Sequence, residues 1–341
     1  MKSGELRQTL QMPSLQALLG LAAARDCNVY MVGGYLRDLV LEREPKQHLD
    51  YDFVVAGATA ISLARAAAER LSGNFVMLDE AFDTARVVLA DCQFDFAGCT
   101  GSGLAEDLQR RDYTINALAW DPLLPDQLID TVGGVADIER KTVRLISESA
   151  VVDDPLRILR AWRFAATLDF VIEEKTRELL ARHIALLCQV AFERISYELF
   201  LLFDSDCAWQ HVKDMGELGA LEQIFPELKD CRRVTANAYH HLGLFDHQVE
   251  SVRQCQLAFA NMPERARRIL SLPMSHSLTR FGAVKISCLL HDIGKPDTWV
   301  ITDEGKHTFI GHDKLGAELS VPLARRMKWS KPLERFVEKM V

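Results

Sequence analysis

The sequence predicts an α/β head followed by a region built from helices. Between residues 28 and 98, short apolar segments of strand character alternate with turn residues and helical segments, as in α/β domains. From residue 153 onward, apolar residues recur at helical spacing. With 341 residues and 48% hydrophobic content, the chain is long enough for two or three domains with real cores. We expect three parts: residues 1–145, 146–205 and 206–341.

The elements of the head follow one another closely. We expect a helix over 15–25, then a buried strand (CNVYMV, 27–32) that leads into a glycine pair and a short helix over 35–41. A second strand (YDFVVAG, 51–57) precedes a helix over 58–73 that ends at a glycine. Three further short strands are predicted at 74–79, 85–90 and 93–98.

The remainder is predicted to be almost entirely helical. Clear helical patterns occupy 153–170, 173–187 and 193–203, and several more follow to the end. The last residues, KPLERFVEKMV, stop inside a helical pattern, so we expect the natural protein to continue past residue 341.

Composition excludes several classes of protein. The eight cysteines are scattered without a Cys-x-x-Cys pair, which argues against a disulfide framework or a zinc ribbon. The N-terminus lacks the apolar core of a signal peptide and no apolar run is long enough to span a bilayer, so we expect a soluble, cytoplasmic protein. Residues 1–205 carry 21 basic and 31 acidic side chains, and residues 206–341 carry 19 and 17. Any polyanion must therefore be held by local arginine clusters or by metal ions.

The stretch GGYLRDLVLEREPKQHLDYDF, residues 33–53, combines features that suit a nucleotide. Gly33 and Gly34 let the backbone approach a ligand just before a helix begins, and Arg37 adds a cation. Asp50 and Asp52 lie one residue apart on a strand, so both project from the same side and can share divalent cations. Either motif alone is weak evidence, since an isolated Asp-x-Asp is usually two solvated acids. Their combination predicts a triphosphate site with metal ions.

Three later motifs favour the triphosphate site over the interpretation that Asp50 and Asp52 are two solvated acids. They are RRDYTINALAWDP (110–122), IDTVGGVADIERKTVRLI (129–146) and DDPLRILRAWRFAATLDF (153–170). With the glycine and aspartate motifs, this ordered set resembles the tRNA nucleotidyltransferase and poly(A) polymerase family, specifically the bacterial class II enzymes. The likeness runs from residue 30 to residue 200. It implies a polymerase-β-like nucleotidyltransferase head with a mixed sheet, a helical neck that recognises the base, and a helical body that binds tRNA.

The resemblance assigns roles to the residues of the glycine and aspartate motifs. Gly33, Gly34 and Arg37 would bind the phosphates of the nucleotide, and Asp50 and Asp52 would hold two Mg²⁺ ions, one of which activates the 3′-hydroxyl of the primer.

Other residues of the head receive roles in the same way. Arg111 and Asp112 would hold the sugar and phosphates of the incoming nucleotide. Asp95 lies on a strand where related enzymes can carry a third metal-binding carboxylate. Taken alone, Arg-Arg-Asp is more often a solvated helix start, and it is the TINAL continuation that favours the nucleotide role.

The predicted helix over 153–170 has two different sides. At about 100° per residue, one side forms a polar ridge and the other is apolar; the ridge consists of Asp154, Arg157, Arg160 and Arg163, and the apolar side includes Ile158, Leu159, Trp162 and Ala165. Spacing alone leaves open an ordinary amphipathic helix with exposed arginines.

The resemblance makes Asp154 and Arg157 an amino-acid template that hydrogen-bonds the Watson-Crick edge of CTP or ATP. Arg160 and Arg163 would then contact phosphates. Asp153 stands where the family usually has Glu. In ERISYELFLLF (193–203), Glu193 and Arg194 would brace the template helix.

Histidines in the last third resemble the HD domain that many bacterial members carry. They are His247 in FDHQVE, His291 followed by Asp292 in LLHDIGKP, and His312 in GHDKLG. Imidazoles with a carboxylate can hold a second divalent metal that activates water for phosphate-ester hydrolysis. The typical pattern closes with a further aspartate, and no clear candidate follows Asp313. A degenerate HD domain that serves only as a platform for tRNA is the alternative.

The leading hypothesis is a Mg²⁺-dependent, template-free nucleotidyltransferase that adds C and A from CTP and ATP to the 3′ end of tRNA. The segment 95–110 is short where many CCA-adding members have a longer flexible loop, so a CC-adding, A-adding or poly(A)-adding enzyme stays open. Two other classes are an HD-type phosphohydrolase with a nucleotide-sensing head, and a noncatalytic RNA-binding protein. Oligomeric state is not predicted.

Overall fold

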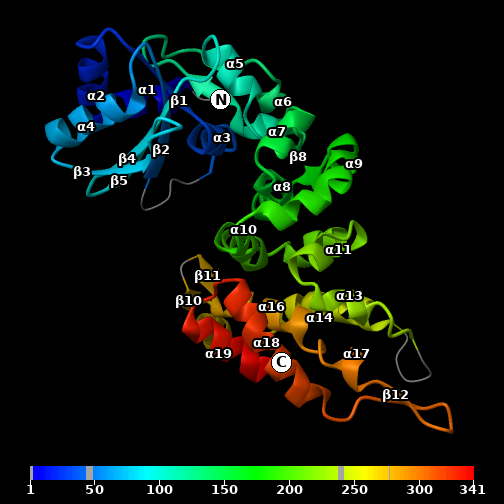
Figure 1. Ribbon diagram of the computed structural model, residues 1–341. Helices are drawn as coiled ribbons and strands as arrows, with labels where there is room; N and C mark the ends of the chain where they lie inside the picture. The colour runs from blue at the N-terminus through cyan, green and yellow to red at the C-terminus, as the bar shows by residue number, and fades with distance from the viewer. Residues whose placement is uncertain (1–2, 44–48, 237–241, 276) are drawn as a thin grey trace. The chain divides into compact units, whose positions relative to one another are not determined.

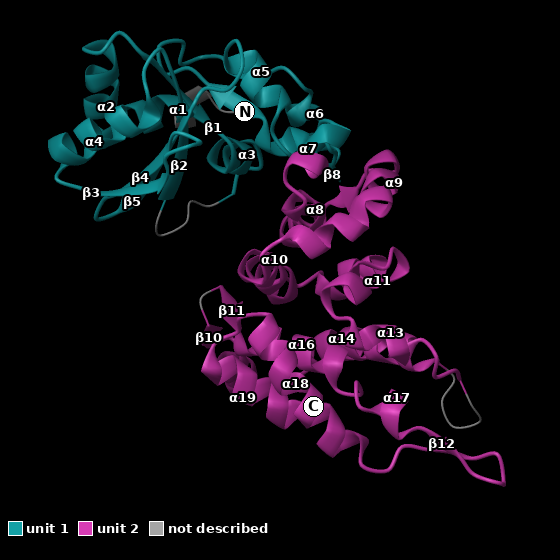
Figure 2. Ribbon diagram, in the orientation of Figure 1, with its two compact units in different colours: residues 1–150 teal, residues 151–341 magenta. Residues whose placement is uncertain are grey.

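Figure 1 shows the computed structural model of the chain, which describes residues 3–43, 49–236, 242–275 and 277–341. The chain divides into two compact units, residues 1–150 and 151–341, coloured separately in Figure 2. The three-part division at residues 145 and 205 stays a prediction. Its first boundary lies close to the division between the two units.

Unit 1 is built on a seven-stranded mixed sheet in the order β3-β4-β5-β2-β1-β6-β7. β2 and β5 are parallel, whereas the other neighbouring strands are antiparallel. The strands are β1 (Asn28–Val32), β2 (Leu49–Ala56), β3 (Asn74–Asp79), β4 (Thr84–Val88), β5 (Cys92–Gly98), β6 (Leu118–Trp120) and β7 (Leu128–Asp130). The predicted α/β head with a mixed sheet is therefore confirmed.

Two strands of this sheet were missing from the prediction. β6 and β7 are three residues each, which is too short for an alternating pattern to register. All three residues of β6 are buried, so the strand shows no polar face in the sequence. The five strands that were predicted are all present.

Helices complete unit 1, and the last of them, α7, continues past residue 150 into unit 2. They are α1 (Ser3–Leu10), α2 (Pro13–Ala23), α3 (Gly34–Val40), α4 (Ala60–Leu71), α5 (Leu104–Gln109), the 3₁₀ turn η1 (Thr114–Asn116), α6 (Gly134–Glu139) and α7 (Glu148–Asp153), with the short strand β8 (Thr142–Val143) between the last two. α4 packs on β4 and β5, and α2 packs on α4 and β1.

The alternation of β2 places its side chains on two different surfaces. Tyr51 and Phe53 are at most 2% exposed and contact Phe94 of β5 on the helix-covered face. Asp50 and Asp52 project from the other face because successive strand residues point to opposite sides. Farther along β2 that face is also covered, since Val54 belongs to a buried cluster with Val32, Leu108, Ala117 and Ala119. The two aspartates thus stand at the uncovered end of the strand.

Unit 2 is helical, as predicted. Its helices are α8 (Leu156–Leu168), α9 (Glu174–His183), the 3₁₀ segment η2 (Ile184–Gln189), α10 (Phe192–Asp204), α11 (Ala208–Glu217), α12 (Ala220–Ile224), α13 (Glu227–Cys231), α14 (Leu244–Ala260), α15 (Glu264–Leu270), α16 (Arg280–Leu290), α17 (Lys295–Thr298), α18 (His312–Arg326) and α19 (Lys331–Met340). Short strands of two or three residues interrupt them: β9 (Val171–Ile172), β10 (Pro273–Ser275), β11 (Leu278–Thr279), β12 (Val300–Ile301) and β13 (His307–Thr308). Helical periodicity does not reveal such short pairings.

Close packing between distant helices holds unit 2 together. α8 packs on α10 and α11, and α14 packs on α16. Trp162 of α8 is fully buried, and its indole Nε1 donates to Asp214 Oδ2 of α11 at 2.6 Å. Among the described residues, no helix is long and apolar enough to span a bilayer.

Candidate functional site

Three carboxylates and an arginine form a row across the sheet of unit 1. Asp52 on β2 lies directly opposite Asp95 on β5, and Asp95 lies opposite Arg86 on β4, so their side chains share one face. Asp50 stands two residues before Asp52 on the same face and is exposed. The row is a surface of oxygen ligands of the kind that Mg²⁺ prefers.

Arg86 is the counter-ion built into this row. Its Nε and one terminal nitrogen each donate to an oxygen of Asp95 at 2.7 Å, a paired geometry. The hydrogen bonds that Arg86 donates to Asp95, with the nearby charges of Asp95, Asp50 and Asp52, raise the pKa of Arg86 above its ordinary value. Asp95 is thus placed beside Asp52, as a third carboxylate would be, but the structure shows it bound to arginine.

Gly33 brings the glycine motif against the aspartate motif. Its φ of +80° is a conformation that favours glycine, and it immediately precedes α3. A Cβ added at this position would lie 3.0 Å from Asp52 Oδ2 and 3.8 Å from a terminal nitrogen of Arg111. Residues from three separate motifs therefore meet at one point. Only glycine leaves room there for a ligand next to the carboxylate.

Arg37 connects the glycine motif to the RRDYTIN segment. Its guanidinium donates to Asp38 Oδ1 at 2.8 and 2.9 Å and to Asn116 Oδ1 at 2.8 Å. Asn116 in turn donates to Asp112 Oδ1 at 3.2 Å, and the same oxygen accepts the backbone N–H of Tyr113 at 2.7 Å. Arg37 and Asp112, both predicted to contact the nucleotide, are anchors of an internal network in this structure.

Arg111 is more accessible than Arg37. It makes long hydrogen bonds of 3.3 and 3.4 Å to Asp107 Oδ2, one turn earlier, and about a quarter of its side chain is exposed. Because those contacts are weak, the guanidinium keeps donors for another acceptor.

The glycine pair Gly133 and Gly134 packs closely against η1. Asp130 accepts hydrogen bonds from four consecutive backbone N–H groups, residues 132 to 135, at 2.8 to 3.2 Å. A Cβ on Gly134 would come within 2.2 Å of the Thr114 carbonyl oxygen, so the chain can approach η1 only with glycine there.

Asp137 fastens this turn to η1 by accepting from Thr114 Oγ1 at 2.7 Å. Burial alone would raise the pKa of Asp137, but hydrogen bonds from Thr114, Arg140 and Arg144 lower it. The carboxylate therefore stays ionised inside the protein.

In unit 2, Asp154 stands just before α8 rather than inside it. Its Oδ1 accepts the N–H of Leu156, the first residue of α8, at 3.2 Å. Its Oδ2 accepts from Arg194 of α10 at 2.8 Å. Arg194 thus braces the predicted template residue, as the resemblance implied. Arg157 follows one turn later and is partly exposed.

The other two arginines of the α8 ridge lie against apolar and acidic neighbours. Arg163 Nε donates to Glu198 of α10 at 2.7 Å, and both side chains are largely buried, at 14% and 6% exposure. Its guanidinium also stacks 3.5 Å above the ring of Phe164, and that of Arg160 lies 5.3 Å from the same ring. We expected Arg163 to contact phosphates, whereas here it ties α8 to α10.

A second polar cluster in unit 2 contains the predicted HD residues. His247 of α14 and His291, just after α16, approach with their Nε2 atoms 3.2 Å apart. Asp292 Oδ2 lies 3.2 Å from His291 Nε2 and 3.5 Å from His247 Nε2. His312 Nε2 at the start of α18 lies 3.6 Å from Asp292 Oδ1. The structure therefore brings all four residues together, and three of them lie within metal-chelating distance of one another.

The orientation of these imidazoles suits metal binding. His291 Nδ1 and His312 Nδ1 lie 2.8 and 2.7 Å from the backbone carbonyls of Cys288 and Phe309, which leaves each Nε2 directed at the cluster. Asp292 is 3% exposed. Burial would raise its pKa, but hydrogen bonds from the two histidines and from Lys295 lower it well below its usual range. The site thus offers an ionised carboxylate beside three imidazoles.

Two protein-family models match the chain. One, described as the poly A polymerase head domain, matches residues 29–101 and 98–144. The other, described as a probable RNA and SrmB-binding site of polymerase A, matches residues 169–232.

Curated relatives extend the match over most of the chain. An A-adding tRNA nucleotidyltransferase of Deinococcus radiodurans is 33% identical over 87% of this chain and 64% of its own length. A CC-adding tRNA nucleotidyltransferase of Geobacter sulfurreducens is 39% identical over 84% and 64%. A multifunctional CCA protein of Pasteurella multocida is 30% identical over 91% of this chain and 72% of its own length.

The chain belongs to the class II tRNA nucleotidyltransferase family. It spans less than two thirds of the length of the A-adding and CC-adding relatives. A solved CCA-adding enzyme in complex with CTP aligns with 99% of this chain and 73% of its own, at 25% identity and a TM-score of 0.67. The predicted family and fold class are both confirmed.

Within this family framework, the head residues predicted from the sequence converge on one place. Gly33, Asp52 and Arg111 meet directly, and Asp50 and Asp95 lie on the same face of the sheet as Asp52. The neck residues belong to unit 2, where Asp154 and Arg157 lie next to each other at the start of α8. Their roles in binding nucleotide stay predictions.

Residue-by-residue interpretation missed the residues that support the predicted site. Arg86, Asp130, Asp137 and Glu198 each hold a predicted site element in position. Asp130 could have been found, because an aspartate three residues before a glycine pair is a typical partner for the exposed N–H groups of a turn. Arg86 and Glu198 could not, since their partners are set by strand pairing and helix packing.

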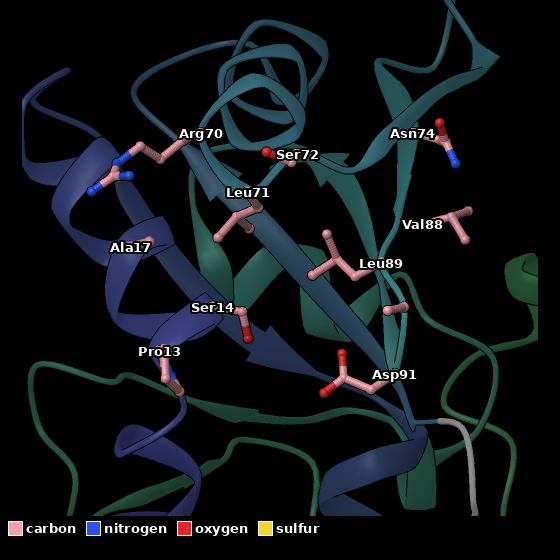
Figure 3. Close-up of a pocket in the computed structure, with 11 residues that line it drawn as sticks. Pro13, Ser14, Ala17, Arg70, Leu71, Ser72, Asn74, Val88, Leu89 and Asp91 are labelled. Atoms are coloured by element: carbon pink, nitrogen blue, oxygen red, sulfur yellow. The ribbon is translucent and has the colours of Figure 1, made fainter.

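The larger pocket described in unit 1 lies away from these motif residues. It is lined by the start of α2, the end of α4, the beginning of β3 and the β4–β5 turn (Figure 3). None of the predicted site residues lines it. A smaller pocket is lined by Thr114, Arg144 and neighbours, next to the η1 support.

Proposed function

We propose that this chain carries the catalytic part of a tRNA nucleotidyltransferase that adds C and A to the 3′ end of tRNA from CTP and ATP. The observation that supports it most is the meeting of Gly33, Asp52 and Arg111, which joins a glycine of positive φ, a carboxylate and a cation at one point. The names of the relatives, which include tRNA nucleotidyltransferases of three specificities, support tRNA as the partner.

Asp50 and Asp52 would hold Mg²⁺, because they offer hard oxygen donors from one face of the same strand. Bound Mg²⁺ would neutralise the triphosphate and favour ionisation of the attacking 3′-hydroxyl. Arg111 would add positive charge next to the phosphates. Gly33 would leave the space that they occupy. Asp95 would act through Arg86, with which it forms a paired ion bridge, rather than as a metal ligand.

Selection of the base would fall to Asp154 and Arg157. An acceptor and a forked donor side by side match the edges of cytosine and adenine, whereas uracil and guanine present the opposite pattern. Arg194 and the Leu156 N–H fix the carboxylate of Asp154, so that its free lone pairs keep a set direction. This fixed orientation supports the proposal that the side chains of Asp154 and Arg157 select the incoming base.

Primer extension tests the proposal. The full chain is incubated with Mg²⁺, tRNA lacking its CCA end, and each nucleotide alone or in pairs. We expect C and A to be added, and Asp52→Asn to reduce the rate by at least about a hundredfold, because removing a metal ligand costs several kcal/mol of transition-state stabilisation. Asp95→Asn should reduce the rate far less, since the amide still bonds Arg86. Addition of C alone or A alone would assign the CC-adding or A-adding alternative, and unaltered activity of Asp52→Asn would refute the proposed site.

We further propose that His247, His291, Asp292 and His312 hold a second divalent metal. The converging Nε2 atoms and the ionised, buried Asp292 support this. Such an ion can activate water for phosphate-ester hydrolysis.

Elemental analysis of the purified chain after dialysis against Zn²⁺, Mn²⁺ or Ni²⁺ tests the second proposal. We expect about one bound ion per chain, lost in His291→Ala, while nucleotide addition by that variant persists. Equal metal content in the wild type and in His291→Ala would contradict the assignment. Release of nitrophenol from a bis-nitrophenyl phosphate, measured in parallel, would add hydrolysis to metal binding.

A further inference from the structure

Two tyrosines connect the glycine motif to the aspartate motif. Tyr35 follows Gly34 at the start of α3. Tyr51 stands between Asp50 and Asp52 in β2. The centroids of the two tyrosine rings lie 4.7 Å apart, with the ring planes inclined by 58°. Tyr51 is 2% exposed and projects from the face of the sheet opposite to the two carboxylates. The ring contact therefore joins the two motifs from the face that does not carry the carboxylates.

The N-terminal segment holds both tyrosines by their hydroxyl groups. The hydroxyls of Thr9 in α1 and of Tyr35 are hydrogen-bonded at 2.8 Å, and Thr9 is 5% exposed. Tyr51 donates to Met12 Sδ, just before α2, at 3.2 Å. Burial and the neighbouring Tyr35 raise the pKa of Tyr51, so this phenol remains a donor at neutral pH. Residues 9–12 contain none of the predicted site residues, and the tyrosines connect them to two motifs that do.

Strand pairing fixes only part of the site. Val32 lies directly opposite Asp52, so the pairing of β1 with β2 brings the end of β1 next to that carboxylate. α3 begins just after Gly33, beyond the paired residues, and its direction depends on what its first turn packs against. Tyr35 belongs to that turn. Its contact with Tyr51 is therefore placed to set the direction of α3 relative to β2.

We propose that Tyr35 is a positioning residue that holds the Gly33 turn at the spacing that a metal-bound triphosphate needs beside Asp52, a role that rests on the proposed nucleotidyltransferase function. A Cβ on Gly33 would lie 3.0 Å from Asp52 Oδ2, so small movements of α3 change the room for a ligand there. Binding groups act efficiently only when they are held within about 0.5 Å of the productive geometry. Tyr35 supports this spacing through Tyr51 and does not itself contact the nucleotide.

Three variants of the full chain test the role of the ring. Tyr35→Ala removes the ring contact and Tyr35→Phe keeps it, whereas Leu63→Ala removes a fully buried side chain from α4. Calorimetry measures the dissociation constant of CTP with Mg²⁺ in the absence of tRNA, and primer extension measures kcat and KM for CTP. We expect Tyr35→Ala to raise the dissociation constant at least about tenfold and to lower kcat by about 10- to 100-fold, because the ligands are misplaced. Tyr35→Phe should change both by less than about fivefold, since the ring remains and only one hydrogen bond is lost.

Leu63→Ala is the control for a general loss of packing. It should lower the melting temperature of unit 1, whereas CTP binding should stay at the wild-type level at a temperature where circular dichroism shows a folded chain. Tyr35→Leu repeats the test with less loss of packing if Tyr35→Ala does not fold, and it should also weaken CTP binding. The rate of each Tyr35 variant should depend on pH as the wild-type rate does, because Tyr35 transfers no proton.

Asp52→Asn separates failure of the positioning role from failure of the proposed function. The positioning role alone would be overturned if Asp52→Asn abolished nucleotide addition while a folded Tyr35→Ala or Tyr35→Leu bound CTP as tightly as the wild type. Equal weakening of CTP binding in Leu63→Ala would overturn it as well. Nucleotide addition that survives Asp52→Asn would refute the proposed function, and the positioning role with it.

Discussion

Gly33 shows how one missing side chain defines a site. Its backbone adopts φ +80°, and an added methyl group would lie 3.0 Å from the carboxylate of Asp52. We expect Gly33→Ala to reduce the rate of nucleotide addition at least about tenfold and to lower the free energy of unfolding by about 1 to 3 kcal/mol, because alanine strains this conformation. Single-turnover primer extension and urea denaturation measure the two effects.

Gly20 provides the matched control. It lies in α2, and an added Cβ would meet nothing within 4 Å. Gly20→Ala should leave the rate unchanged and raise the free energy of unfolding by up to about 1 kcal/mol, since alanine is the better helix former. A wild-type rate in Gly33→Ala would show that the contact between Gly33 and Asp52 has no part in catalysis.

At the scale of elements, α8 is held in position by its apolar side and by a buried ion pair between Arg163 and Glu198 of α10. Arg163 is 14% exposed and its partner Glu198 only 6%, whereas the pair between Arg7 and Asp126 is 63% and 55% exposed. Removing one member of a buried pair leaves an uncompensated charge, at a cost of about 3 to 5 kcal/mol. We therefore expect Arg163→Met to lower the unfolding midpoint of unit 2 strongly, as followed by the fluorescence of the buried Trp162.

Arg7→Met tests whether burial is the cause. An exposed pair contributes less than about 1 kcal/mol because water screens both charges. The two variants remove the same side chain type from ion pairs of different exposure. Equal, small effects of both would mean that the pair between α8 and α10 does not stabilise unit 2.

At the scale of the whole molecule, the charges are unevenly distributed. Residues 206–341 carry a net charge of only +2, so tRNA must be held by a local patch if this region binds it. α15 offers one: Arg265, Arg267 and Arg268 are all exposed, and within the described parts of the chain none of them has an ion pair.

We expect replacement of all three α15 arginines by glutamine to weaken tRNA binding. The slope of log binding constant against log salt concentration should also decrease, by about one unit for each phosphate that is no longer neutralised. Filter binding between low and moderate salt measures both quantities. The same change at Arg25 and Arg70, exposed in unit 1, is the control. An unchanged slope in the α15 variant would place the phosphate-binding residues elsewhere.

Much of the fold followed from local patterns. The alternation of β2 predicted that Asp50 and Asp52 share a face, and the buried Tyr51 between them confirms it. Helical spacing predicted which side of α8 packs, and Ile158 and Trp162 are indeed fully buried. Such patterns are determined by neighbouring residues, because a strand repeats every two residues and a helix every 3.6.

The sequence by itself thus determined the order of the longer elements, the family, and which side chains these strands and helices present. Only the tertiary structure decided their partners: Asp52 beside Gly33 and Arg111, Asp95 bound to Arg86, and Arg163 bound to Glu198. These pairings join residues far apart in the chain. They depend on strand register and helix packing, which arise from the summed burial of many side chains, so no short stretch of sequence records them.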